Sequence, residues 1–354
     1  MNMPGINISF TEKAATAIQR GERGIIAMII KGVVPATNPL EILSAADIPA
    51  TFSAANKKQI ENALKGYINT PKKVIVYCLG SSAEDYSEAL DALELVKFNY
   101  LVAPSCETDE QTDTIASWVG AKREDGKKIK AILPNSASDK EYIINYTTES
   151  VTDEDGTTYT AEQYCSRIAG IIAGTPLSIS CTYAPLAELA DCTRLKKAEM
   201  DAAVAAGKLF VFHDGEKVKL ARGITSLTTI TEEKGEQFQK IKIVDAMDMI
   251  TDDITKTVED SYIGKYANSY DNKCILISAI SNYFESLKKS AILSDYSVEI
   301  DIASNKAWLD LHGYKTAEMS DDEIKQANTG DKVFLLASVK ILDAIEEVTL
   351  PISI

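Results

Sequence analysis

The sequence predicts an α/β fold, α+β overall, with an α/β core around a mainly parallel sheet and a C-terminal α+β domain. From about residue 70, short apolar runs alternate with amphipathic helical patterns, which is typical of strands joined by crossover helices. Beyond residue 236 the pattern changes to long helices followed by strands. Both ends of the chain alternate apolar and polar residues, which predicts extended, strand-like N- and C-terminal arms.

Apolar runs of strand length mark the sheet of the α/β core. Runs without polar alternation suit parallel strands that are buried on both faces. We expect strands at 25–30, 74–79, 100–103 and 128–133. Between the second and third of these, Leu90 and Leu93 lie on one side of an expected helix, with Ser81 and Glu84 as its capping box. Thr108 is expected to cap the next helix.

The segments after this core are shorter and more varied. An extended stretch at 142–148 precedes an acidic turn at 153–156 and a helix of small residues through 164–173. A helix over 195–206 then leads to a hairpin over 209–220, whose Asp214-Gly215 pair supplies the tight turn.

Long helical patterns dominate the C-terminal domain. A strand is expected at 238–244, then a helix with Met247, Ile250, Ile254 and Val258 on its buried side, and a second helix over 273–289. Strand patterns follow at 296–302 and 333–341. The acidic residues of the first helix are read as a solvated face, or alternatively as a contact patch for a basic partner; they are Asp245, Asp248, Asp252 and Asp253.

Composition narrows the function classes. The net charge of −15 over 354 residues, without a basic stripe, argues against a nucleic-acid binder. No apolar run is long enough to span a membrane, and no signal-peptide pattern is present, so we expect a cytoplasmic protein without membrane insertion. The six cysteines show no metal-like spacing and are expected to be reduced and mostly buried.

Catalytic motifs are missing from the sequence. His213 and His312 are the only histidines, and both are expected to be turn or loop residues. The usual nucleophile, zinc and phosphate-binding motifs do not occur, and the acidic turn at 153–156 lacks the distal carboxylate of a calcium loop. We therefore expect no catalytic, cofactor-binding or metal site, and no enzyme.

Both ends of the chain have the residue pattern of β-strands. Pro351 removes one backbone donor, so the C-terminal strand suits a sheet edge. Such arms either add to the sheet of a neighbouring subunit or fold back onto their own domain, and the alternation alone slightly favours folding back. The apolar faces of the arms are Ile6, Ile8 and Phe10 at one end and Val348, Leu350, Ile352 and Ile354 at the other.

An ordered set of short blocks resembles a phage-type contractile tail sheath protein, close to the short diffocin-like sheaths of R-type bacteriocins. The blocks span nearly the whole chain and lie at 3–10, 20–27, 159–176, 221–229, 240–250, 262–266, 330–334 and in the closing strand. One departure is that residues 31–70 are too few for the β-sandwich insertion of longer members. This resemblance reverses the earlier preference for arms that fold back onto their own domain. The expected partner of each arm is now another copy of the chain.

The resemblance implies four parts. They are an N-terminal arm (1–20), a sheath α/β domain (21–235), a C-terminal sheath domain (236–345) and a C-terminal arm (346–354). It further implies a subunit that forms helically stacked hexameric rings around an inner tail tube protein and contracts to drive the tube through a cell envelope. Implied partners besides self are baseplate and tail terminator proteins. The particle, a phage tail or a bacteriocin, would assemble in the bacterial cytoplasm and leave by lysis, without a cofactor.

Residue roles also follow from the resemblance. The arms would add strands to a receiving sheet that contains Val333, Leu335, Ala337, Val339 and Ile341. Lys288 and Lys289 are candidate tube contacts, although an ordinary role as helix C-terminal cations fits them equally. Two alternatives stay open: a type VI secretion-like sheath component, which is usually split between two chains, and a cytoplasmic α/β metabolic enzyme.

Overall fold

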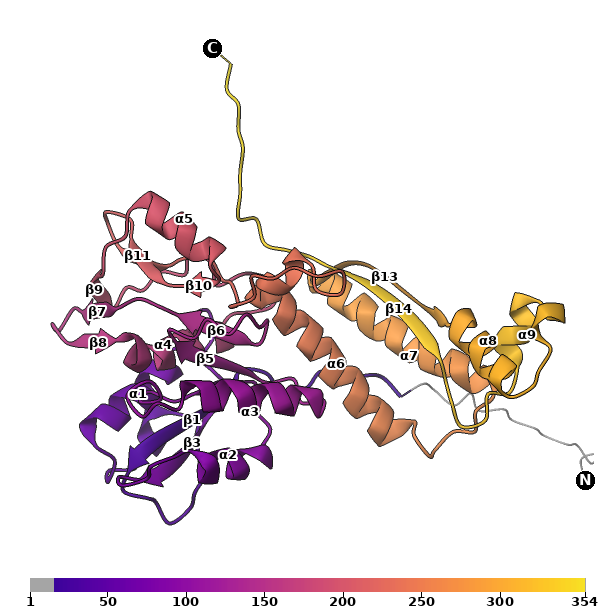
Figure 1. Ribbon diagram of the computed structural model, residues 1–354, viewed down its shortest axis with the longest axis horizontal. Helices are drawn as coiled ribbons and strands as arrows, with labels where there is room; N and C mark the ends of the chain where they lie inside the picture. Colours follow the sequence, from indigo (N-terminus) through magenta and orange to yellow (C-terminus); the bar gives the residue numbers. More distant parts are fainter. Residues whose placement is uncertain (1–15, 354) are drawn as a thin grey trace, which may run out of the picture. The chain divides into compact units, whose positions relative to one another are not determined.

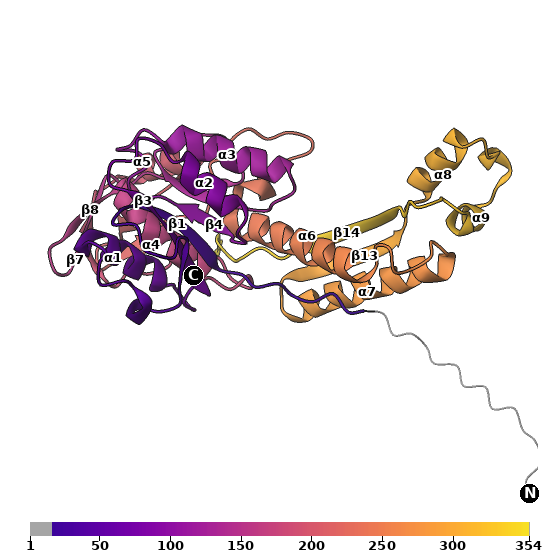
Figure 2. The same cartoon turned by 90° about the horizontal axis from the view of Figure 1, so that it is seen from below.

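The computed structural model describes residues 16–353, which divide into two compact units (Figures 1 and 2). One unit, called here the α/β unit, comprises Gly21–Asp252 together with the C-terminal segment from Leu342. The other, called the ribbon unit, comprises Asp253–Ile341 together with the N-terminal segment that ends at Arg20. The long helix α6 (Ile241–Ser261) belongs to both units, because the division falls within it.

A seven-stranded sheet forms the centre of the α/β unit, in the order β10-β6-β5-β4-β1-β3-β2. Its pairings are parallel except for the edge strand β2, which is antiparallel to β3. The expected mainly parallel sheet is therefore confirmed. The strands are β1 (Ile25–Gly32), β2 (Leu40–Ile42), β3 (Lys73–Gly80), β4 (Tyr100–Val102), β5 (Lys130–Pro134), β6 (Ile143–Tyr146) and β10 (Lys208–Leu209).

Helices cover both faces of this sheet (Figure 1). The helices α1 (Ala54–Leu64) and α4 (Ala161–Ala173) pack on one face, and α2 (Ser87–Glu94) and α3 (Thr112–Glu124) pack on the other. Alternate residues of β1 supply the two cores, since successive side chains of a strand point to opposite faces. A glycine brings α1 and α4 together: a Cβ at Gly170 would lie 2.2 Å from the carbonyl oxygen of Ala63.

Two expected helix caps are wrong. Helix α2 begins at Ser87 and not near Ser81, because residues 80–83 form a turn in which the Ala83 amide donates to the Gly80 carbonyl. The Thr108 hydroxyl donates to Glu162 Oε1 at 2.6 Å instead of capping α3, which begins at Thr112. At Thr108, a carboxylate 54 residues away in the sequence therefore takes the hydroxyl group that the capping pattern assigns to the helix.

A small sheet, a hairpin and two short helices complete the α/β unit. A three-stranded antiparallel sheet has the order β8-β7-β9, and the expected acidic turn connects its first two strands. The hairpin expected over 209–220 is confirmed, with Asp214 Oδ1 accepting from the amides of Glu216 and Lys217. The elements are η1 (Ala45–Asp47), β7 (Ser150–Asp153), β8 (Thr158–Thr160), β9 (Leu189–Cys192), α5 (Lys197–Ala205), β11 (Val211–His213) and β12 (Val218–Leu220).

The strand expected at 238–244 is wrong. A 3-10 turn, η2 (Glu236–Gln239), occupies its start, and α6 begins at Ile241. The apolar residues at 241, 243 and 244 are all buried, because the first turns of α6 are covered on every side. When every residue of a short run is buried, its apolar residues show no periodicity, so the sequence pattern cannot distinguish a strand from a helix.

The ribbon unit consists of helices and one two-stranded antiparallel sheet. The second half of α6 is followed by α7 (Tyr270–Lys289), and β13 (Leu293–Ile300) pairs with β14 (Leu335–Ile341). Between these strands the chain forms α8 (Ile302–Leu311), η3 (Thr316–Glu318) and α9 (Asp321–Gln326). Residues 16–20 pack on this unit: Ile18 is buried, and the Tyr262 hydroxyl donates to the Thr16 carbonyl at 3.0 Å.

Candidate assembly surfaces

The C-terminal arm beyond residue 347 is extended and solvated. Residues 348–353 have no assigned secondary structure, and Val348, Leu350 and Ile352 are 81%, 75% and 78% exposed. Ile354 and the N-terminal residues Ile6, Ile8 and Phe10 lie outside the described residues. The described copy therefore presents one apolar stripe with a two-residue period, on a segment without a partner strand.

The root of this arm, residues 342–347, is attached to the α/β unit. The side chain of Glu346 is only 8% exposed, and its carboxylate accepts a hydrogen bond from Arg222 Nε at 2.9 Å. Arg222 Nη2 lies 3.1 Å from the carboxylate of Glu347, and Lys240 pairs with Asp343. The arm thus changes at residue 347 from a fixed segment to a free one.

The ribbon β13–β14 is the candidate receiving sheet. It has only two strands, so within the described residues each strand has one edge without a partner strand. Leu335, Val339 and Ile341 lie in β14 and are half-buried, whereas Ala337 is exposed. Unpaired backbone donors and acceptors along such an edge are a template for a further strand.

Val333 lies outside this sheet, two residues before β14 begins. The turn before it explains the difference. The Lys332 amide donates to the Thr329 carbonyl at 3.1 Å, and Asn268 Nδ2 donates to the carbonyls of Gly330 and Lys332 at 2.9 and 2.8 Å. These bonds hold the backbone in a turn where the apolar alternation predicts a strand.

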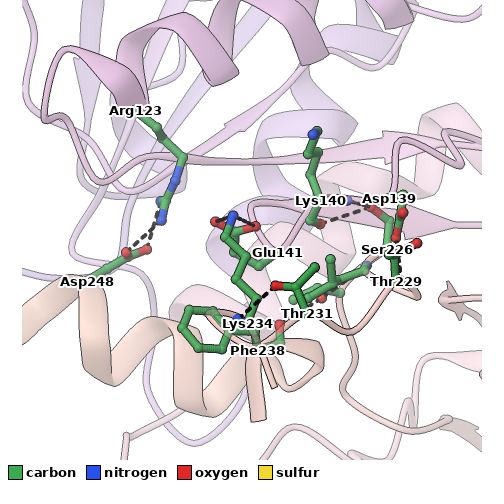
Figure 3. Close-up of polar contacts among 12 residues, drawn as sticks. Arg123, Asp139, Lys140, Glu141, Ser226, Thr229, Thr231, Lys234, Phe238 and Asp248 are labelled. Carbon is green, nitrogen blue, oxygen red and sulfur yellow. Dashed lines mark hydrogen bonds and ion pairs between the residues drawn. The ribbon is translucent and has the colours of Figure 1, made fainter. Parts of the chain in front are cut away.

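Helix α6 is fixed to the α/β unit by buried ion pairs (Figure 3). Asp248 accepts hydrogen bonds from Arg123 Nη1 and Nη2 at 3.0 and 2.9 Å and pairs with Lys130. Asp245 lies 3.1 Å from Lys130 Nζ and accepts a hydrogen bond from the Tyr100 hydroxyl at 2.7 Å. Burial alone would raise the pKa of Asp248, but Lys130 and Arg123 hold it below its usual value.

These contacts overturn the expected solvated acidic face, because Asp245, Asp248 and Asp253 are all buried. Asp253 accepts a hydrogen bond from the Tyr283 hydroxyl at 2.7 Å within the ribbon unit. The acidic side of α6 is therefore an internal structural surface, and a basic partner protein has no access to these three carboxylates.

The segment before α6 is fixed by a second group of polar contacts (Figure 3). Both carboxylate oxygens of Glu141 lie 3.0 Å from Lys234 Nζ. Asp139 Oδ1 accepts from the amides of Thr228 and Thr229 at 2.6 and 3.0 Å. Hydrogen bonds from the Thr229 side chain and from these amides lower the pKa of Asp139. Residues 226–240 are thus fixed to the rest of the α/β unit even though they have little secondary structure.

Lys288 and Lys289 end α7 and are exposed. Each has a carboxylate of its own chain nearby, since Lys288 Nζ lies 3.9 Å from Asp295 and Lys289 Nζ lies 3.8 Å from Glu285. Their positions fit helix C-terminal cations and also leave their amines accessible to an acidic partner.

Residues with catalytic potential have structural roles. His213 Nδ1 accepts the Gly215 amide at 2.9 Å, and His312 caps α8 with its ring stacked 3.7 Å from that of Trp308. Five cysteines are buried and Cys274 is half-buried. Within residues 16–353 there is no group of three potential metal ligands and no helix that is long and apolar enough to cross a bilayer.

The mainly parallel sheet, the two-stranded ribbon and the exposed arm together define the class of protein, which the comparisons with known proteins identify as a structural subunit. Residues 80–226 match the phage tail sheath protein central domain, and residues 233–354 match the phage tail sheath C-terminal domain. A tail sheath protein of the Clostridium phage phiCD119 is 40% identical over 352 residues, covering 98% of this chain and 97% of that protein. The chain belongs to the phage tail sheath family, and it is a structural sheath protein.

Solved structures have the same fold. The sheath tail protein of Desulfitobacterium hafniense superposes with a TM-score of 0.69 at 21% identity, over 84% of this chain and 94% of that one. A sheath chain from the contracted PVC complex, an extracellular contractile injection system, gives a TM-score of 0.69 at 13% identity, over 100% and 98% of the two chains. At these identities the likeness extends to the fold alone.

Proposed function

We propose that this chain polymerises into helically stacked hexameric rings around an inner tube, and that the assembled sheath contracts to drive the tube through a cell envelope. Strand exchange joins the copies: the C-terminal arm of one copy, with the N-terminal residues 6–10 of another, adds to the ribbon β13–β14 of a third. The observation that carries this proposal is the pairing of an exposed, alternating apolar arm with a sheet that has free edges.

The chemistry of the arm suits strand addition. Backbone hydrogen bonds to a sheet edge supply affinity, and alternate side chains supply specificity. Val348, Leu350 and Ile352 would turn their shared face to the apolar side of the ribbon, where Leu335, Val339 and Ile341 are only half-buried. Pro351 lacks one donor and so suits the outer position of an added strand.

Further parts of the proposal concern partners. Lys288 and Lys289 are proposed to contact acidic groups of the tube protein. Baseplate and tail terminator proteins are proposed to bind the ends of the sheath, which would be assembled in the bacterial cytoplasm and released by lysis. Contraction would use free energy stored during assembly, because the alternative packing of the subunits is lower in free energy.

Removal of the free arm tests the proposal. Deletion of residues 348–354 leaves the root contacts of Glu346 intact, so the monomer is expected to fold with an unchanged circular dichroism spectrum. The wild-type chain is expected to form hollow tubes in negative-stain micrographs, and the truncated chain none. Normal tubes from the truncated chain would contradict strand exchange.

Two point variants test whether tube formation depends on the apolar face of the arm and not only on its length. Leu350→Asp places a carboxylate on the face that would be buried, whereas Thr349→Asp places the same group on the opposite face. We expect Leu350→Asp to reduce tube yield at least tenfold and Thr349→Asp to retain most of it. Equal effects of the two variants would argue against a strand with one buried face.

A further inference from the structure

We infer that the C-terminal arm is an extension of the α/β unit and not of the ribbon unit, although β14 precedes it in the chain. A clamp formed by Arg222 and Glu346 fixes the point at which the arm leaves the subunit. The inference rests on the proposed function, in that the arm is taken to bind a second copy of this chain.

The clamp is built around one buried carboxylate. Glu346 Oε1 accepts from the Thr182 hydroxyl at 2.6 Å and from the Ser180 hydroxyl at 3.2 Å, and Oε2 accepts from Arg222 Nε at 2.9 Å. A buried carboxylate with three donors is held strongly, because freeing it leaves both the charge and its donors without partners. Glu347 adds a second, exposed contact to the same guanidinium.

The loops that donate to Glu346 are themselves fixed. The Thr182 hydroxyl accepts the Gly223 amide at 2.9 Å, which joins the loop at 180–182 to the residue after Arg222. A Cβ at Gly223 would lie 2.8 Å from Cys181 Sγ, so the two loops approach as closely as a glycine permits. The two loops are therefore joined to each other by contacts that do not involve the arm.

A second contact holds the start of the root. Lys240 pairs with Asp343, and the ammonium group of Lys242 donates to the Leu342 carbonyl. Both lysines belong to the α/β unit. Attachment therefore begins at the first residue after the ribbon unit and continues to residue 347, a distance of six residues without regular secondary structure.

The N-terminal arm shows the reverse arrangement. Residues 16–20 precede the α/β unit in sequence, but they pack on the ribbon unit through Ile18, through the Thr16 carbonyl and through Arg20, whose Nη2 donates to Ser290 Oγ at 3.1 Å. Each arm is thus rooted on the unit at the far end of the chain. An arm bound to a second copy would link the α/β unit of one subunit to the ribbon of the next, and tension on the arm would reach the α/β unit without passing through β14.

Limited proteolysis of the monomer tests the clamp without assembly. Arg222→Ala retains Glu346 and Glu347 as cleavage sites for a glutamyl endopeptidase, and we expect release of the C-terminal peptide to be about tenfold or more faster than in the wild type. Arg194→Ala, which removes an exposed arginine paired with Asp191 on the same unit, is the matched control and should cleave at the wild-type rate. An unchanged rate in Arg222→Ala overturns the clamp.

A second variant and a second readout keep the test decisive. Lys240→Gln removes only the Asp343 pair and is expected to accelerate the same cleavage several-fold, so the attachment of the arm to the α/β unit is judged on this variant if Arg222→Ala fails to fold. In negative stain, Arg222→Ala should give fewer or irregular tubes, and tubes of wild-type yield and helical repeat would overturn the inference. If the wild-type chain forms no tubes, the proposed function fails, and the clamp is then decided by the cleavage rates alone.

Discussion

Replacement of Asp248 by asparagine measures how firmly α6 is held by the α/β unit. The substitution keeps the shape of the side chain but removes the charge that faces Arg123 at 2.9 Å and Lys130. Breaking a buried ion pair by neutralising one partner typically costs 3–5 kcal/mol, because the other charge stays buried. Asp245 remains 3.1 Å from Lys130 Nζ, so we expect the lower end of this range, about 3 kcal/mol.

The stability lost in Asp248→Asn should depend on pH. The folded-state pKa of Asp248 is lowered, so its ionised form stabilises the fold above the unfolded carboxyl pKa of about 3.9, and this stabilisation is lost as the pH falls through the lower folded-state value. Asparagine does not titrate. The difference in unfolding free energy between wild type and Asp248→Asn should therefore be largest near neutral pH and should shrink below about pH 4.

Urea denaturation followed by circular dichroism at pH 7 and at pH 3.5 measures both quantities. Glu259→Gln, an exposed carboxylate near the other end of α6, is the control and should change stability by less than about 0.5 kcal/mol. Adding Lys130→Met to Asp248→Asn should recover part of the loss, because it removes one of the two buried cations that Asp248 no longer neutralises. A loss below about 1 kcal/mol, or one independent of pH, would refute the assignment of Asp248 as a buried, ionised anchor.

Two further predictions concern packing and thiol burial. Gly170→Ala should lower the free energy of unfolding by about 3 kcal/mol and lower the melting temperature, because the added Cβ would meet the Ala63 carbonyl. Gly80→Ala is the control and should change stability by less than about 1 kcal/mol, since its Cβ would have no atom within 4 Å. Equal melting temperatures of the two variants would contradict the close contact of α1 and α4. Of the six thiols, Cys274 should react first with a thiol reagent at neutral pH, since the other five are buried. Burial also raises the pKa of Cys106 and Cys181 to about 12, which keeps these thiols protonated and unreactive. A second thiol that reacts as fast in the native protein would contradict this prediction.

The sequence predicts the central sheet well because its signals are local. Continuous apolar runs such as 74–79 correspond to strands buried between two helical layers, and the Asp214-Gly215 pair marks a hairpin through backbone geometry alone. The histidines are expected in turns or loops, and the outcome is mixed. His312 lies in the turn that ends α8, whereas His213 is the last residue of β11 and contacts the turn only through its ring.

Features that depend on distant partners could not be predicted. Asp245 and Asp248 resemble a solvated helix face until Arg123 and Lys130, more than a hundred residues earlier, are placed beside them. The clamp is hidden for the same reason, because Glu346 follows a strand and precedes an exposed arm, and only the fold brings Arg222 to it. The one available signal was the pair of acidic residues at the start of an arm whose other side chains are uncharged.

The free edges of the ribbon β13–β14 give the proposed polymer two chemically different ends. A copy joined on one side only would leave its sheet edge open at one end of the filament, and at the other end a copy would leave its arm unbound. An open sheet edge pairs readily with any extended chain, and an unbound arm exposes apolar side chains to water. The two ends would therefore need different covering proteins, so growth of the filament could be started and stopped independently.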